Sequence, residues 1–129
     1  MIEVNKTYDL LPDIDKQAYL EYAKGAFATM LKAPGLVEIR VYRSLLGSPQ
    51  VRLTLLWQTL ADWAKFAESP ERQRLDSGLL KFANNIGIEL WGPSPAVPQS
   101  LSVPASKLVN VSREAQSAMV IRWTQYLMY

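Results

Sequence analysis

The sequence predicts an α+β sandwich, in which helices cover one face of a four-stranded antiparallel sheet. In residues 51–80 an apolar strand passes directly into an amphipathic helix. Residues 1–31 show the same strand–helix order, which indicates a repeated unit. Two further strands, near residues 36–45 and 86–90, complete a β-α-β-β-α-β order, which is that of the ferredoxin-like sandwich.

The first unit combines a strand at residues 2–10 with a helix at residues 15–31. Pro12-Asp13 separates the two, and Asp13 or Asp15 can cap the exposed N–H groups of the helix. Apolar residues recur at spacings of three and four, which predicts one buried face made of Tyr19, Tyr22, Ala23, Ala26, Phe27, Met30 and Leu31. Pro34-Gly35 then ends the helix in a turn.

The middle strands form the predicted hairpin. Apolar and polar residues alternate along both strands, which are joined by a turn at Gly47-Ser48-Pro49. A second helix begins near Leu60, and Ser69-Pro70 interrupts it before a further helical run over residues 71–82. A fourth strand follows.

The alternation divides the sheet residues between two faces. The face predicted to pack against the helices carries Ile2, Val4, Val37, Ile39, Val41, Leu53, Leu55, Ile86, Ile88 and Leu90. The face left uncovered carries Glu3, Asn5, Thr7, Glu38, Arg40, Tyr42, Arg52, Thr54, Glu89 and Trp91. What covers this second face decides the function.

Three segments follow from these patterns. Residues 1–92 form the α+β domain, and residues 93–111 contain a run of prolines that predicts a stiff extended linker. Residues 112–129 predict a C-terminal helix with an apolar stripe, although residues 119–123 also suit a strand. This arm is expected to dock, either on its own domain or on a partner subunit.

Composition excludes several kinds of chemistry. The chain has no histidine and no cysteine, so serine triads, thiolate nucleophiles and the common haem, zinc and iron sites cannot be built within one subunit. We therefore expect no metal and no cofactor. A net charge of +2 argues against nucleic-acid binding, and no apolar run is long enough to span a membrane. No signal peptide is apparent, so a cytoplasmic location is expected.

Residues 53–75, LTLLWQTLADWAKFAESPERQRL, resemble the antibiotic-biosynthesis-monooxygenase-like proteins of the dimeric α/β-barrel superfamily. The similarity extends over about residues 1–92 and rests on the element order together with Trp57, Phe66 and Ser69-Pro70. It implies that two subunits pair their uncovered sheet faces into a barrel, forming a homodimer. It also implies a small-molecule pocket, between sheet and helices or inside the barrel.

The resemblance also bears on chemistry. Haem-degrading relatives use Asn, Trp and His, whereas this chain has Asn5 but carries Phe66 and Asp76 at the other two positions. Those departures argue against haem degradation. Cofactor-free oxygenases of the superfamily polarise a phenolic substrate with Asn, Trp and Arg, residue types that the uncovered sheet face supplies.

The candidate pocket on the uncovered face therefore consists of Asn5, Glu38, Arg40, Tyr42, Arg52, Glu89 and Trp91. Individual catalytic residues are not assigned. The sequence predicts a small-molecule-binding dimeric barrel, with cofactor-independent monooxygenation of an aromatic or enolic substrate as the implied reaction. The alternative is a non-catalytic binding or assembly module with a swapped C-terminal arm. An enzyme needs a pocket with converging polar groups, whereas an assembly module can fill that volume with side chains.

Overall fold

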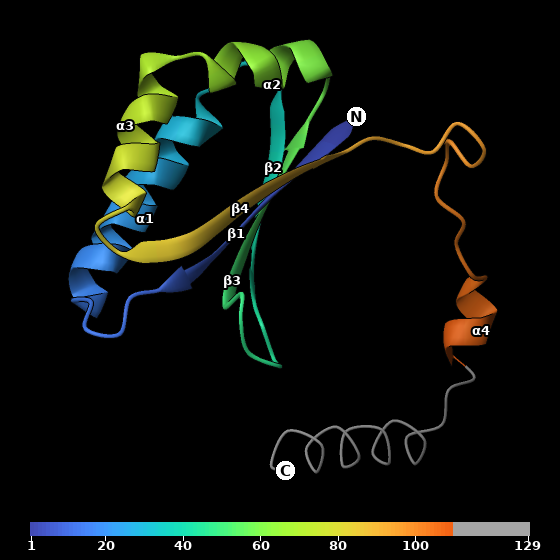
Figure 1. Cartoon of the computed structure of the whole chain (residues 1–129). Coiled ribbons are helices and arrows are strands. Elements are labelled where there is room, and N and C mark those ends of the chain that lie inside the picture. Colours follow the sequence, from blue (N-terminus) through green and yellow to red (C-terminus); the bar gives the residue numbers. More distant parts are fainter. Residues whose placement is uncertain (110–129) are drawn as a thin grey trace. The chain divides into compact units, whose positions relative to one another are not determined.

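The computed structural model describes residues 1–109, which divide into two units after Pro93. The first unit contains four strands and three helices (Figure 1): β1 Ile2–Leu10, α1 Lys16–Leu31, β2 Leu36–Arg43, β3 Val51–Trp57, α2 Leu60–Ala67, α3 Pro70–Leu79 and β4 Ala83–Trp91.

The second unit contributes one described helix, α4 at Ala105–Val109. It lies within the segment 93–111 that the prolines predict as a linker, and the amide of Lys107 donates to the carbonyl of Pro104 across its first turn. The proline that stiffens the preceding chain is therefore also part of this turn. The predicted C-terminal helix at 112–129 lies outside the described residues.

The four strands form one antiparallel sheet in the order β2-β3-β1-β4. The helices α1, α2 and α3 all lie on one face of it (Figure 1), and no helix of residues 1–93 covers the other face. This arrangement confirms the predicted α+β ferredoxin-like sandwich. Pairing of two such sheets into a barrel stays a prediction.

Local signals explain where each helix begins. The Asp15 carboxylate accepts hydrogen bonds from the amides of Gln17 and Ala18 at 3.0 and 3.2 Å, and so caps α1. Thr59 caps α2 by accepting from the amide of Asp62 at 3.1 Å. The second helical run ends at Leu79 rather than at residue 82, because β4 already begins at Ala83.

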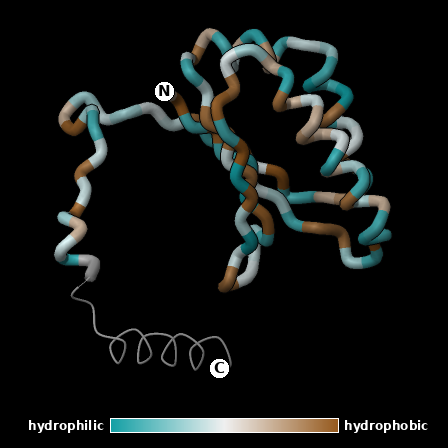
Figure 2. Tube along the Cα trace, turned by 180° about the vertical axis from the view of Figure 1, so that it is seen from behind, coloured by the Kyte–Doolittle hydropathy of each residue, from teal (hydrophilic) through white to brown (hydrophobic). Residues whose placement is uncertain are grey.

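The core lies between the two central strands and the helices. Its buried members are Val4, Ala26, Met30, Leu53, Leu55 and Trp57. The alternation of hydrophobic and hydrophilic residues that produces it is visible along the strands in Figure 2. A second cluster of Tyr8, Leu79 and Ala83 continues the core toward the other end of the sheet.

Three details differ from the predicted core. Val37 lies at a β-bulge, where the pairing of β2 with β3 shifts register, and Leu36 packs against the core instead. Val41 remains 54% exposed because β2 is an edge strand of the sheet. Ile86, Ile88 and Leu90 remain 39%, 45% and 41% exposed because β4 is the other edge strand. Leu31 is exposed because it is the last residue of α1.

A glycine is required at the turn between α1 and β2. Gly35 has φ of +89°, and a Cβ atom there would lie 2.3 Å from Cγ of Asp62. Its carbonyl accepts a hydrogen bond from the amide of Gln58 at 2.8 Å, which ties this turn to the end of β3. None of the helices in the described part of the chain is long and apolar enough to cross a membrane.

Candidate functional site

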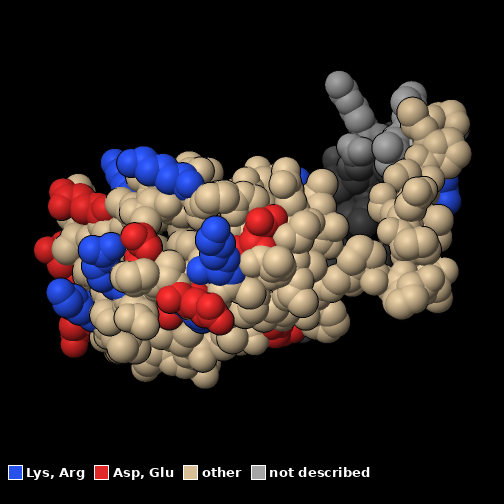
Figure 3. All heavy atoms as spheres, turned by 90° about the horizontal axis from the view of Figure 1, so that it is seen from above, with Lys and Arg blue, Asp and Glu red and all other residues tan. Residues whose placement is uncertain are grey.

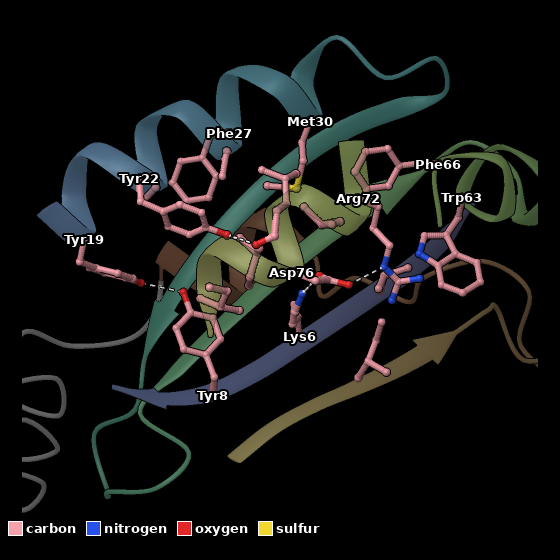
Figure 4. A pocket seen from close by; sticks show the side chains of 18 residues that line it. Lys6, Tyr8, Tyr19, Tyr22, Phe27, Met30, Trp63, Phe66, Arg72 and Asp76 are labelled. Atoms are coloured by element: carbon pink, nitrogen blue, oxygen red, sulfur yellow. Dashed lines mark hydrogen bonds and ion pairs between the residues drawn. The ribbon is translucent and has the colours of Figure 1, made fainter. Parts of the chain in front are cut away.

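A cavity of about 70 Å³ lies between the sheet and the three helices (Figure 4). Most of its lining is apolar or aromatic, with Phe27 and Met30 from α1 and Trp63 and Phe66 from α2. The full lining is Val4, Lys6, Tyr8, Tyr19, Tyr22, Ala23, Ala26, Phe27, Met30, Leu53, Leu55, Trp63, Phe66, Arg72, Leu75, Asp76, Leu79 and Ile88. The cavity therefore offers an apolar space with a few polar groups at fixed places.

Three charged side chains meet in this cavity. Nζ of Lys6 lies 2.6 Å from Oδ1 of Asp76, and Nε of Arg72 lies 3.0 Å from Oδ2 of the same carboxylate. The side chains of Lys6, Arg72 and Asp76 are 19%, 30% and 40% exposed. The cluster is therefore partly withdrawn from water, and solvent reaches it mainly at the carboxylate.

The sequence around Ser69 positions two members of this cluster. Ser69 caps α3 by accepting from the amide of Arg72 at 3.3 Å, and Pro70 occupies the first turn, where its missing N–H costs nothing. Arg72 and Asp76 are four residues apart, so they lie on one side of α3. Nη1 of Arg72 also donates to the carbonyl of Ala67 at 3.3 Å, which fixes the guanidinium.

The third member comes from the centre of the sheet. Lys6 on β1 pairs with Leu53 on β3 and with Ile88 on β4, and all three side chains line the cavity. A lysine here is surrounded by apolar neighbours, and Asp76 supplies the opposite charge that such a position requires.

Three tyrosines line the end of the cavity near the start of α1. The hydroxyls of Tyr8 and Tyr19 are hydrogen-bonded at 2.7 Å, and the Tyr22 hydroxyl donates to the carbonyl of Leu75. Burial is the main reason that the pKa of Tyr8 lies well above its ordinary value, and the hydrogen bond with the Tyr19 hydroxyl raises it further. Burial, then the charge of Asp76, raises the pKa of Tyr22 to about 12. Both phenols are therefore neutral at physiological pH.

Gly78 allows α3 to approach the Tyr22 ring. A Cβ atom at this position would lie 2.6 Å from Cε2 of that ring. The close approach brings the Tyr22 hydroxyl to the carbonyl of Leu75, one turn earlier in α3. Packing between α1 and α3 thus sets the wall of the cavity.

All seven residues predicted from the sequence as pocket candidates lie elsewhere, at the alternate strand positions whose side chains point away from the helices. Asn5 pairs with Thr54 and Glu89, Glu38 with Leu56, Arg40 with Thr54, Tyr42 with Arg52, and Trp91 with Glu3. We call this surface the open face. As ligand-binding residues these seven stay a prediction.

Several side chains of the open face form hydrogen bonds with one another. The Thr54 hydroxyl donates to Oδ1 of Asn5 at 2.6 Å, and Nε1 of Trp91 donates to Glu89 at 3.1 Å. Arg40 donates to Glu38 and, at 3.4 Å, to the hydroxyl of Tyr42. Both bonds raise the pKa of the Arg40 guanidinium, and the bond to Tyr42 has the larger effect.

The open face also contains a depression of about 170 Å³, lined by Glu3, Glu38, Arg40, Tyr42, Thr54 and Leu56. The guanidinium carbon of Arg52 lies 4.4 Å from the centre of the Tyr42 ring, a cation–π arrangement beside this depression. The fold therefore places the seven predicted pocket residues on one surface, and that surface is shallow and polar.

Sequence reasoning did not assign Lys6 and Arg72 to a site. For Lys6 the signal was present, because residues 2, 4, 6 and 8 of a strand share one face and a lysine on an otherwise apolar face is conspicuous. In the sequence, Asp76 stands out only because it occupies the position of the haem-ligating histidine of haem-degrading relatives. Its pairing with a residue 70 positions earlier follows from the tertiary structure and has no local signal.

Charges outside the cavity are mixed in sign. Figure 3 shows acidic and basic side chains interspersed on the face seen from above. Within residues 1–109, no group of three or more acidic, histidine or cysteine side chains is arranged to hold a metal ion.

Comparison with known proteins identifies the fold. No protein-family model and no curated protein matches the chain. A proposed antibiotic biosynthesis monooxygenase from Deinococcus radiodurans matches with a TM-score of 0.62 at 15% identity, covering 81% of this chain and 100% of that one. SnoaB, a cofactor-independent oxygenase from Streptomyces nogalater, matches with a TM-score of 0.59 at 10% identity, covering 76% and 97%.

A dimeric protein of unknown function with a ferredoxin-like fold, from Bacteroides fragilis, matches with a TM-score of 0.51 at 14% identity, covering 70% of this chain and 93% of that one. At these identities the similarity is one of fold. The chain thus has the fold of antibiotic-biosynthesis-monooxygenase-like proteins, as the resemblance in the sequence predicted.

Proposed function

We propose that this chain forms a homodimeric α/β barrel that binds a compact organic molecule in the cavity between its sheet and helices. We further propose that it is a cofactor-independent monooxygenase of an aromatic or enolic substrate. The fold shared with a cofactor-independent oxygenase supports the reaction class. The cavity between the sheet and the helices supports the proposed location of the reaction.

The observation that carries the proposal is the combination of an apolar cavity with converging polar groups. Tyr8, Tyr22, Lys6 and Asp76 all line the same space among aromatic and aliphatic side chains. An assembly module has no need for such a space and can fill it with side chains. Ligand sites have this composition, with few polar groups placed in a mainly apolar lining.

The volume limits the size of the substrate. A single water molecule needs roughly 10–15 Å³, and a cavity of roughly 150 Å³ binds benzene. At about 70 Å³, this cavity holds several waters or one compact organic molecule. A polycyclic phenol, and even a single ring the size of benzene, needs more space, so a small enolic substrate suits the site better.

The arrangement suits a substrate that reacts with oxygen through its own electrons. Lys6 stabilises an enolate or phenolate oxygen, and Asp76, held by Arg72, is the carboxylate among the lining residues that can accept the substrate proton. The carbanionic carbon of the enolate then gives an electron to O₂ and forms a C–O bond. The resulting peroxide anion takes back the proton that Asp76 accepted. The remaining C–H proton then leaves as the O–O bond breaks, which releases one water and turns a CH₂ group into C=O.

The open face supports the homodimer. It carries an exposed Trp91 and half-exposed Tyr42 beside charged residues, and no helix of residues 1–93 covers it. A dimeric protein with this fold gives a precedent for association. Pairing two open faces would withdraw both aromatic side chains from water.

Oxygen uptake tests the reaction. Pentane-2,4-dione is the compact enolic probe and would give pentane-2,3,4-trione with one molecule of water. Phenol tests whether the cavity widens to admit an aromatic ring and would give benzoquinone with one molecule of water. With ¹⁸O₂, one labelled atom should enter the organic product and one should enter water. The proposal is contradicted if neither probe raises oxygen uptake above the protein-free rate, or if uptake requires an added flavin or metal.

A further inference from the structure

We propose that the cavity selects an organic monoanion, whose charged oxygen binds Lys6 while its apolar part lies among the aromatic residues. This inference rests on the proposed ligand site and specifies the charge of what enters it. Its substrate class is a compact carboxylate or enolate. Uncharged molecules of the same shape should bind more weakly.

The charge count of the cavity carries this inference. Its lining contains two cations, Lys6 and Arg72, and one carboxylate, Asp76. The phenols of Tyr8 and Tyr22, whose pKa values are raised, add no charge at neutral pH. The lining therefore carries one net positive charge in a space with mainly apolar walls, where a bound anion gains more than it would in bulk water.

The hydrogen-bonding capacity of Lys6 identifies the contact. Its ammonium group has three N–H donors, and the described contacts use one of them, on Asp76 at 2.6 Å. Two donors therefore remain for a ligand or for water. Arg72 is more fully engaged, because it donates both to Asp76 and to the carbonyl of Ala67. Lys6 is thus the anion-binding residue, and Arg72 positions the carboxylate.

Asp76 then competes with the ligand for the same ammonium group. Its carboxylate forms ion pairs with both cations, Lys6 and Arg72, in the unliganded protein. Neutralising it should free them for an incoming anion. This opposition gives the proposal a signature that a merely structural role for the cluster would not produce, because two variants of one ion pair should change affinity in opposite directions.

Binding of isobutyrate and its uncharged counterpart isobutyramide tests the proposal. The measurement is an NMR titration of the full-length chain at pH 7, which follows amide shifts. Because a hydrogen bond to a charged group is worth roughly tenfold or more in affinity, isobutyrate should bind about tenfold more tightly than isobutyramide. Lys6→Met should abolish most of that preference, whereas Asp76→Asn should strengthen isobutyrate binding.

Lys24→Met is the matched control, since Lys24 is an exposed lysine on α1 that does not line the cavity. It removes the same net charge and should leave both affinities unchanged. Equal binding of isobutyrate and isobutyramide to the wild-type protein would overturn the proposal. So would loss of isobutyrate binding in Asp76→Asn when circular dichroism shows the variant to be folded.

The two proposals can fail separately. Isobutyrate cannot undergo the oxygenation described above, so its binding reports only on the charge of the site. A preference for isobutyrate without oxygen uptake from the diketone or phenol would reject the oxygenase and keep the anion site. Oxygen uptake with no preference for isobutyrate would reject the anion site and keep the oxygenase.

Discussion

Removing the Asp76 carboxylate should destabilise the protein by about 2 kcal/mol. Exposed ion pairs contribute about 0.2–1 kcal/mol, whereas breaking a buried pair costs about 3–5 kcal/mol. Lys6 is 19% exposed and Arg72 is 30% exposed, so Asp76→Asn leaves two partly buried cations without their partner. The expected loss lies between these limits. It corresponds to a decrease in Tm of roughly 8–12 °C for a unit of this size.

Urea unfolding of Asp76→Asn measures this loss, and the same helix supplies a control. Arg74 and Glu71 form a pair at 3.5 Å with side chains 74% and 48% exposed, so Arg74→Gln should change the free energy of unfolding by less than about 0.5 kcal/mol. If Asp76→Asn is as stable as Arg74→Gln, the cluster contributes no more than a surface pair. Partial burial would then add nothing to the strength of these ion pairs.

Three further outcomes follow from the same structure. Tyr8 and Tyr22 have raised pKa values, about 12 for Tyr22 against an ordinary 10.0. Their contribution to the free energy of unfolding is therefore fully present below pH 10 and is lost as the pH rises toward 12. Phenolate absorbance should show two of the six tyrosines ionising late, and one common transition at pH 10 would contradict this. Hydrogen bonds to the Asp9 carboxylate, of which the bond from Ser48 has the largest effect, lower its pKa below the ordinary 3.8. The stability that they contribute is present above pH 3.8 and is lost as the pH falls through the lowered pKa. Asp9→Asn should therefore weaken the acid dependence of unfolding, and an unchanged acid profile would argue against this role. Light scattering should find a dimer that Arg52→Glu weakens, whereas a wild-type monomer at micromolar concentration would exclude pairing of the open faces.

The fold could be predicted because its signals are local. Ser69-Pro70 marks a helix start wherever it precedes a helical run, and alternation along residues 51–57 places Leu53 and Leu55 on one face. What the sequence could not show is how far the helices extend over the sheet. Val41 and Ile88 follow the predicted alternation and still remain near half exposed, because edge position depends on strand order.

The candidate site was harder to predict for a related reason. Charged residues on a polar face, such as Arg40 and Glu38, are conspicuous in a sequence, and the structure does bring them together. The cavity cluster depends on a contact between β1 and α3, which are separated by most of the domain. Lys6 is conspicuous on an apolar strand face, but only the tertiary structure places Asp76 opposite it.

The most direct measurement of the central claim is a map of where isobutyrate binds. Backbone amide shifts in the NMR titration should change most around Lys6 on β1, Tyr22 on α1 and Asp76 on α3, which all line the cavity. Changes centred instead on Arg40, Tyr42 and the rest of the open face would contradict the account, and would place the ligand between paired sheets.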